Sequence, residues 1–197
     1  MSGNLHVFIQ EHIVQGWWKK RQRPVLVNSW ESFYVRFTQK DLLRLAKQGR
    51  ELGMGFGLWV EPEMASEDSG LYKAHPDWIL GRHEQAIGRT QYVLNLSRPE
   101  VQDYLTAVLT KVFKEAKPAY VKWDMNRIMT DAYSSALPPE RQGEVRHRYI
   151  LGLYRVLDAL TARFPKILFE SCTSGGNRTD PGHGRFWQQD VCADGGE

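Results

Sequence analysis

Two charged side chains, Lys122 and Asp124, stand two positions apart in the apolar run AYVKWDM at residues 119–125. Residues two apart in an extended strand point to the same face of a sheet. A lysine beside a carboxylate lowers the pKa of that carboxylate and keeps it ionised, which is the state that a nucleophile needs. The spacing therefore indicates either a nucleophilic carboxylate or a structural ion pair, and the residues alone leave both interpretations open.

Other polar and aromatic side chains follow the apolar runs of the chain: Trp30, Trp59, Glu61, Cys172 and a carboxylate near the end of the chain. Trp59 and Trp123 have rings that could stack on a sugar face, although a lone tryptophan more often packs in a core. Glu61 and Glu63 flank Pro62, which distorts a strand, so we interpret both glutamates as structural. The scattered histidines and the two cysteines lack metal-ligand spacing, and we expect neither a metal nor a cofactor.

Short apolar runs and amphipathic helices alternate along the chain and must position these side chains. Apolar runs predict strands within residues 24–30, 55–63, 119–125 and 166–172, and helical periodicity predicts helices at 38–53, 98–117 and 146–164. Strands and helices joined by short connections predict a parallel sheet with crossover helices. In such sheets chemistry gathers at the C-terminal ends of the strands.

The ends of two predicted helices carry specific signals. Thr38 and Asp41 resemble a capping box at the start of the first helix, and Gly53 is expected to end that helix. Ser97 and Glu100 predict a second capping box, at the start of the helix that begins near residue 98.

The composition excludes several classes of protein. The 197 residues have a net charge of +3 and scattered basic residues, so we expect neither a nucleic-acid partner nor a membrane surface. Two cysteines without a disulfide pattern, and an N-terminus without an apolar signal segment, predict a reducing, cytoplasmic location.

Six long segments carry a resemblance to a known family. They are RPVLVNSWES (23–32), GLWVEPEM (57–64), LYKAHPDW (71–78), RTQYVLNLSRPEV (89–101), KWDMNR (122–127) and FESCTSGGNRTDPG (169–182). In this order they resemble the melibiase-type α-galactosidases of glycoside hydrolase family thirty-six. The resemblance covers nearly the whole chain and implies an α/β fold of the (β/α)8 TIM-barrel type. It also implies a retaining mechanism on α-galactoside oligosaccharides such as melibiose or raffinose.

The resemblance also implies roles for individual residues. Asp124 matches the nucleophile, and four further positions match the wall of the galactose pocket: Trp59, Arg89, Lys122 and Cys172. Ungapped counting from the FESC segment makes Asp194 the acid/base, whereas matching by Trp187 would choose Asp190. We prefer Asp194, because a gap is the extra assumption. A homo-oligomer like those of the family is compatible with the sequence.

Three departures from the family pattern lead us to expect an incomplete barrel. The family has a β-sandwich before the barrel and a closing domain after it, and we expect both to be absent from residues 1–197. A strand ending Asp-Asp-Gly-Trp is missing between the NSW and GLW segments, which predicts the loss of one internal βα unit. The last barrel strands are expected to be missing after Glu197.

Three functions remain open from the sequence. The first is α-galactosidase activity. The second is a catalytically inactive remnant or a sugar-binding half-barrel of the same family, which the missing strand favours for this chain. The third is a related enzyme with another sugar specificity or with transferase behaviour.

Overall fold

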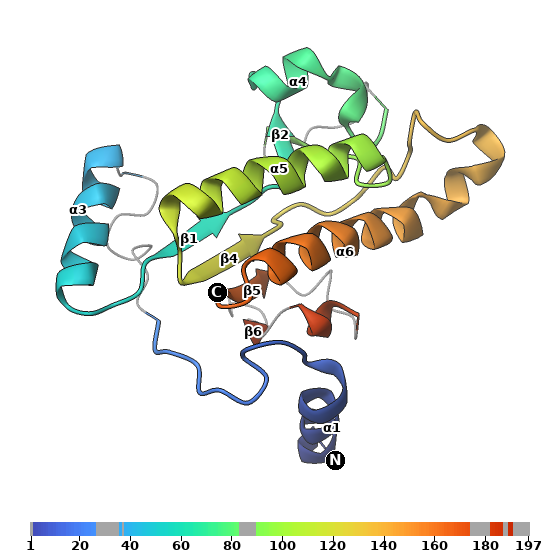
Figure 1. Ribbon diagram of the computed structural model, residues 1–197. Coiled ribbons are helices and arrows are strands. Elements are labelled where there is room, and N and C mark those ends of the chain that lie inside the picture. Colours follow the sequence, from blue (N-terminus) through green and yellow to red (C-terminus); the bar gives the residue numbers. More distant parts are fainter. Residues whose placement is uncertain are drawn as a thin grey trace.

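A four-stranded parallel sheet lies at the centre of the protein, in a computed structural model that describes residues 2–26, 36, 38–82, 90–173, 182–186 and 189–190. The strands lie in the order β1, β4, β5, β6 (Figure 1). Their bounds are β1 Gly57–Val60, β4 Tyr120–Asp124, β5 Leu168–Cys172 and β6 Gln189–Asp190. Neighbouring strands are parallel throughout, so the predicted parallel sheet is confirmed over these strands.

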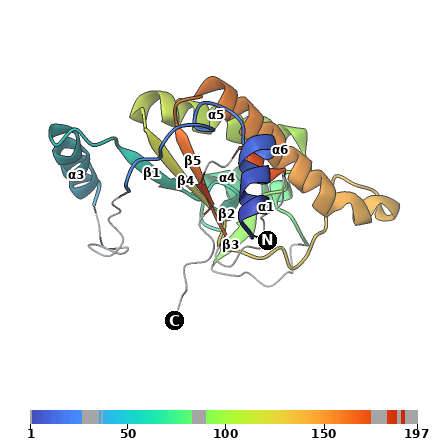
Figure 2. The same cartoon turned by 90° about the horizontal axis from the view of Figure 1, so that it is seen from below.

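Two long helices cover one face of this sheet. Helices α5 (Pro99–Ala116) and α6 (Val145–Arg163) lie together along one side of β1, β4 and β5 (Figure 2). The core between helices and strands includes Val121, Trp123, Phe169, Leu105, Leu109, Phe113, Leu153, Val156, Leu157 and Leu160. Alternate residues of the strands therefore face the helices, and the remaining residues face the other side. No helix in the described parts of the chain is long and apolar enough to cross a membrane.

Gly152 allows α6 to approach the segment that precedes α5. A Cβ atom at this position would lie 1.9 Å from the carbonyl oxygen of Leu96 and 2.7 Å from Nε2 of Gln102. The amide of Gln102 also donates to the same Leu96 carbonyl, at 2.7 Å. Glycine is thus required here because a side chain would overlap the neighbouring backbone.

Helix α3 (Gln39–Glu51) precedes β1 and stands to one side of the sheet (Figure 1). The predicted capping box is confirmed, because Thr38 and Asp41 each accept a hydrogen bond from the backbone N–H of the other. The predicted stop is confirmed as well: Leu52 is the C-cap, and Gly53 follows with φ at +75°. β1 begins soon afterwards, at Gly57.

Shorter elements complete the described structure. The helix α1 (Ser2–Phe8) continues into the π-helical turn η1 (Ile9–Ile13). After β1, the antiparallel strands β2 (Met64–Ser66) and β3 (Gln91–Val93) flank α4 (Gly70–Ala74) and the 3-10 turn η2 (Pro76–Trp78). The 3-10 turns η3 (Pro139–Glu144) and η4 (His183–Arg185) precede α6 and β6.

Two local predictions need correction. The strand expected within 24–30 is not formed at residues 24–26, where Val25 is 92% exposed, and residues 27–30 lie outside the described part. Pro24 lacks the N–H that a strand ladder requires. Ser97 does not cap α5: the N-cap is Arg98, and the Ser97 hydroxyl donates to Oδ1 of Asn95 instead. Asn95 therefore competes successfully for the capping side chain.

Candidate active site

A row of polar and aromatic side chains crosses the face of the sheet opposite α5 and α6. Trp59 of β1, Lys122 of β4 and Glu170 of β5 occupy aligned positions in the register of the three strands. Asp124 and Cys172 form the next aligned pair toward the C-terminal ends of β4 and β5. The register thus places the predicted residues of three strands on one face, at the end where parallel sheets carry chemistry.

The carboxylate of Asp124 is held by three hydrogen-bond donors and is only 5% exposed. Its Oδ1 accepts the backbone N–H of Met125 at 2.9 Å. Its Oδ2 accepts the indole Nε1 of Trp59 at 3.1 Å and Nδ2 of Asn126 at 2.6 Å. These contacts fix the plane and the direction of the carboxylate at the end of β4.

Asn126 connects Asp124 to a second carboxylate, that of Glu61. Oε1 of Glu61 accepts both the backbone N–H and Nδ2 of Asn126, each at 3.0 Å. Glu61 directly follows β1, and Asn126 follows β4 by two residues, so two neighbouring strand ends are tied together by side chains. The sequence indicates a structural role for Glu61, whereas in the structure it binds Asn126, which contacts the predicted nucleophile.

Lys122 pairs with Glu170, a partner that the sequence did not indicate. The distance from Lys122 Nζ to Glu170 Oε1 is 3.3 Å, and the other oxygen of Glu170 accepts the hydroxyl of Tyr120. Burial and the hydrogen bond to Glu170 raise the pKa of the Tyr120 phenol. Lys122 and Asp124 do share a face, but the ion pair at this end of the sheet is formed by Lys122 and Glu170.

The two tryptophans near the site have different roles. Trp123 is fully buried among the core residues and donates its Nε1 to Glu63 at 2.7 Å. The carboxylate of Glu63, itself buried, also accepts the hydroxyl of Tyr149 in α6. Trp123 and Glu63 are therefore structural. Trp59 is 55% exposed, and so it can meet a sugar.

Some predicted positions are not described. Trp30, Arg89, Asp194 and the glycine-rich segment 174–178 lie outside the described residues. Asp190 is aligned with Ser171, in the register row that also contains Trp123, rather than in the row of Glu170 and Lys122. The structure thus brings together Trp59, Lys122, Asp124 and Cys172.

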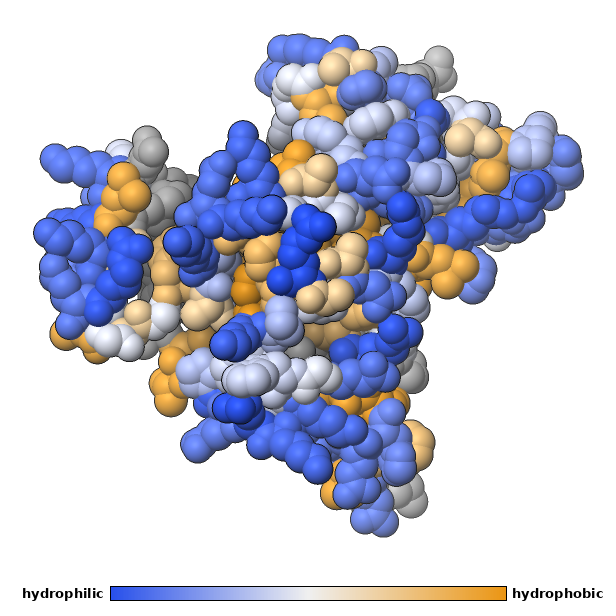
Figure 3. Space-filling model, in the orientation of Figure 1, coloured by the Kyte–Doolittle hydropathy of each residue, from blue (hydrophilic) through white to orange (hydrophobic). Residues whose placement is uncertain are grey.

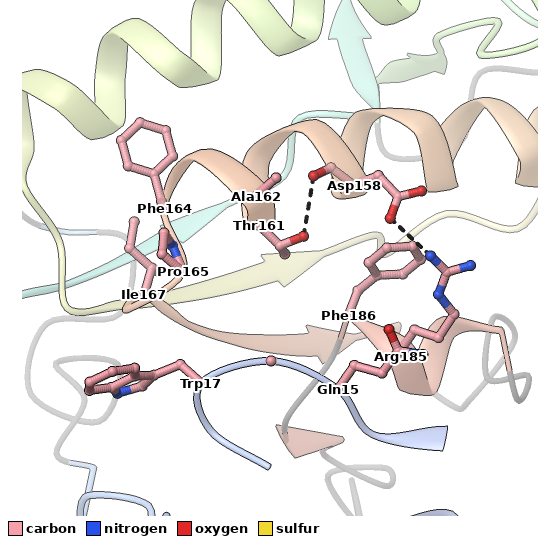
Figure 4. Close-up of a pocket in the computed structure, with 11 residues that line it drawn as sticks. Gln15, Trp17, Asp158, Thr161, Ala162, Phe164, Pro165, Ile167, Arg185 and Phe186 are labelled. Atoms are coloured by element: carbon pink, nitrogen blue, oxygen red, sulfur yellow. Dashed lines mark hydrogen bonds and ion pairs between the residues drawn. The ribbon is translucent and has the colours of Figure 1, made fainter. Parts of the chain in front are cut away.

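A cavity of about 230 Å³ lies away from this site (Figure 4). Its wall includes Trp17, Phe164, Pro165 and Ile167, and the last three residues precede β5, at the opposite end of that strand from Cys172. The ion pair of Arg185 with Asp158, at 3.0 Å, borders it. Within the described segments, no group of three histidine, cysteine or acidic side chains could hold a metal ion.

The sequence did not indicate the residues that form hydrogen bonds or ion pairs with the predicted site residues. Glu170 precedes Cys172 by two positions, so strand alternation could have placed it on the same face. Asn126 follows Asp124 by two positions, but it lies beyond the end of β4, where alternation no longer applies. Its contact with Glu61 depends on the loops after the strands, and no sequence signal indicated it.

Comparison with known proteins identifies a family. The sequence profile of the Melibiase family matches residues 1–55 and 45–196. α-Galactosidase AgaA of Geobacillus stearothermophilus is 42% identical over 230 residues, with 92% of this chain covered, and α-galactosidase 1 of Pediococcus pentosaceus is 36% identical, with 96% covered. The chain spans about a third of the length of these relatives, 32% in both cases.

Solved structures agree with the sequence comparison. The crystal structure of AgaA superposes with a TM-score of 0.90 and 41% identity, over 98% of this chain and 34% of that chain. The α-galactosidase of Lactobacillus brevis superposes with a TM-score of 0.81 and 36% identity, over 89% of this chain and 30% of that one. By sequence and by fold, the chain therefore belongs to the melibiase-type α-galactosidases of glycoside hydrolase family 36.

Proposed function

We propose that this chain carries the nucleophile half of a retaining α-galactosidase that acts on terminal α-galactosyl residues. One observation carries the proposal: Asp124 ends β4 with its carboxylate fixed by three donors, beside the exposed ring of Trp59. A retaining glycosidase needs such an oriented carboxylate to attack the anomeric carbon. Lys122, one register row before Asp124, can donate to a sugar hydroxyl from the same face.

The substrate class follows from the relatives. Variants of AgaA have been crystallised with raffinose and with stachyose, which both carry α-galactosyl groups. We assign galactose to the face lined by Trp59, Lys122 and Cys172, and we add Arg89 from the family resemblance. Charged donors to sugar hydroxyls contribute about 1.5–3 kcal/mol each, which suits the two cationic side chains for orienting the ring.

Asp194 is our proposed acid/base. Two variants of AgaA, one crystallised with stachyose and one with raffinose, each have one aspartate replaced. The two replaced aspartates are as many residues apart in AgaA as Asp124 and Asp194 are in this chain. Retaining chemistry places the second carboxyl group about 5–5.5 Å from the nucleophile.

We further propose that the (β/α)8 barrel lacks one internal βα unit, before β1. The two matches to the family profile overlap at residues 45–55, and the alignment with AgaA is longer than this chain. Among the described strands, β1 pairs with β4 alone. Hydrophobic side chains reach the surface on the lobe that α3 forms at the left of Figure 3, and Leu43, Leu52 and Met54 are exposed. These features fit a missing neighbour.

This gap favours a second function for the isolated chain: a remnant that is inactive or that only binds sugar. Catalysis needs a substrate held to a fraction of an ångström, and small misplacement costs about a hundredfold. The chain should be purified and assayed on a nitrophenyl α-galactoside. We expect turnover far below the usual range of about 1–1000 per second. A monodisperse monomer with turnover in that range would contradict the missing-unit proposal.

The role of Asp124 has its own test. Asp124→Asn should lower any measured turnover by several orders of magnitude, and azide or formate should partly rescue Asp124→Ala because a small anion can replace the carboxylate. Asp103→Asn, at an exposed position in α5, is the control. Near-full activity of Asp124→Asn would exclude it as the nucleophile.

A further inference from the structure

One amide nitrogen of Asn126 bridges two carboxylates. Nδ2 has two hydrogens, and it donates to Glu61 Oε1 at 3.0 Å and to Asp124 Oδ2 at 2.6 Å. Glu61 Oε1 also accepts the backbone N–H of Asn126, at 3.0 Å. Turning the amide by half a rotation would direct its carbonyl oxygen at both carboxylates, which is repulsive. Both carboxylates therefore select the same end of the amide, and Glu61 holds Asn126 by two hydrogen bonds, from its backbone N–H and from Nδ2.

The two carboxylate oxygens of Asp124 differ in the number of hydrogen bonds that they accept. A carboxylate oxygen has about two lone pairs that accept hydrogen bonds. Oδ2 uses both, one for Trp59 Nε1 and one for Asn126 Nδ2. Oδ1 uses one, for the backbone N–H of Met125, and no other donor among the described residues reaches it. Among the donors that the structure describes, Oδ1 thus keeps a lone pair for a reaction.

We propose that Glu61 is a positioning residue, which acts through Asn126 to hold Asp124 with Oδ1 as the attacking oxygen. The proposal rests on the proposed role of Asp124 as the nucleophile. Without Glu61, Asn126 loses two of the hydrogen bonds that hold it, so its side chain holds Oδ2 of Asp124 less firmly and the two oxygens of Asp124 are less well distinguished. A misdirected nucleophile slows the covalent step more than it weakens sugar binding.

The reaction assigns a separate task to each oxygen. The lone pair of Oδ1 forms a bond to the anomeric carbon while the glycosidic C–O bond breaks. The electron pair of that bond stays on the leaving oxygen, which takes a proton from the acid/base. Oδ2 becomes the carbonyl oxygen of the galactosyl ester and keeps its donors, Trp59 and Asn126. Water then replaces Oδ1 at the anomeric carbon and gives its proton to the same acid/base, which restores both carboxyl groups.

Covalent labelling measures the first step without steady-state turnover. The probe is a fluorinated α-galactosyl fluoride, and intact-mass spectrometry follows its attachment to Asp124 in the whole chain. Glu61→Leu removes the acceptor, and we expect labelling to slow by roughly ten- to a hundredfold with little change in the probe concentration at half saturation. Glu61→Gln keeps an acceptor oxygen and should restore most of the rate. Glu115→Leu, at an exposed glutamate of α5, should match the parent chain.

The side-chain amide of Asn126 reports the contact itself, whether or not the chain is active. In ¹⁵N NMR spectra its two hydrogens should exchange slowly with water and shift on Glu61→Leu and on Asp124→Ala, but not on Glu115→Leu. The proposal would be overturned if the amide signal of Asn126 did not shift in Glu61→Leu, or if that variant were labelled at the same rate as the parent chain. It would also be overturned by a Glu61→Gln variant as slow as Glu61→Leu.

Two further outcomes separate the proposals. A parent chain that takes no label, with an amide signal that responds to both variants, would overturn the proposed function and support the positioning contact. A Glu61→Leu variant that hydrolyses nitrophenyl galactosides but not raffinose would overturn positioning, because that pattern marks Glu61 as the acid/base.

Discussion

The indole Nε1 of Trp59 donates a 3.1 Å hydrogen bond to Oδ2 of Asp124, although the two residues are 65 positions apart in the chain. Trp59, which we propose meets the sugar, therefore also orients the proposed nucleophile. Trp59→Phe keeps an aromatic ring and removes the donor. We expect this change to slow covalent labelling of Asp124 by about ten- to a hundredfold, the value of one hydrogen bond to a charged group. Trp17→Phe, at a distant tryptophan, is the control, and equal labelling rates for both variants would contradict the prediction.

The choice between Asp194 and Asp190 can be made by the dependence of the rate on the leaving group. Good leaving groups need little protonation, so the variant that lacks the acid/base should retain activity on aryl galactosides and lose it on raffinose. We expect this pattern for Asp194→Ala and not for Asp190→Ala. The assignment is wrong if the two variants show the reverse.

Removing the Lys122 ammonium should destabilise the fold, because it leaves the carboxylate of Glu170 without its cation. The side chain of Glu170 is only 3% exposed. A buried carboxylate without its cation costs about 3 kcal/mol. Lys122→Met should therefore lower the free energy of unfolding in urea by that order, and the double variant Lys122→Met/Glu170→Gln should recover most of the loss. Lys111→Met, at an exposed lysine of α5, should change little. Equal stabilities of the Lys122 single and double variants would exclude the ion pair as the cause.

A methyl group at position 152 should be poorly tolerated. Its Cβ would lie 1.9 Å from the carbonyl oxygen of Leu96, so α6 must move away from the segment before α5. We expect Gly152→Ala to cost about 1–3 kcal/mol or more of unfolding free energy. Gly143→Ala is the matched control, because no atom lies within 4 Å of its added Cβ. If Gly152→Ala and Gly143→Ala unfolded at similar temperatures, α6 would be able to move away from Leu96 without loss of unfolding free energy.

The start of α6 predicts a pH dependence of stability. Hydrogen bonds from Arg141 and Arg148 lower the pKa of Glu144 from its ordinary 4.5 to about 2. A lowered carboxyl pKa stabilises the folded state above pH 4.5, and this stabilisation is lost as the pH falls toward 2. Glu144→Gln should thus reduce the difference in Tm measured between about pH 6 and about pH 3. An unchanged difference would mean that the arginines do not hold Glu144 in solution.

The local elements could be predicted from the sequence, because periodicity and terminal signals are local. The apolar positions of α6 and the Thr38–Asp41 capping box are examples. The pairing of Lys122 with Glu170 could not be predicted from the sequence, since it depends on the register between β4 and β5. The contact of Glu61 with Asn126 could not be predicted either, because Pro62 interrupts the strand there and the loop that brings Asn126 to Glu61 has no sequence signature. Ser97 failed as a cap because Asn95, two residues earlier, binds the same hydroxyl.

The arrangement of α5, β4, α6 and β5 has a consequence for folding. These four elements follow one another in the chain, and they supply most of the core, so their contacts close over short stretches of sequence. Local contacts of this kind form early and fast. Lys122, Asp124 and Glu170 can therefore be placed by one contiguous segment, whereas Trp59 and Glu61 join from a distant part of the chain. We therefore expect β4, which bears the proposed nucleophile, to form before Trp59 and Glu61 join the site from outside this segment.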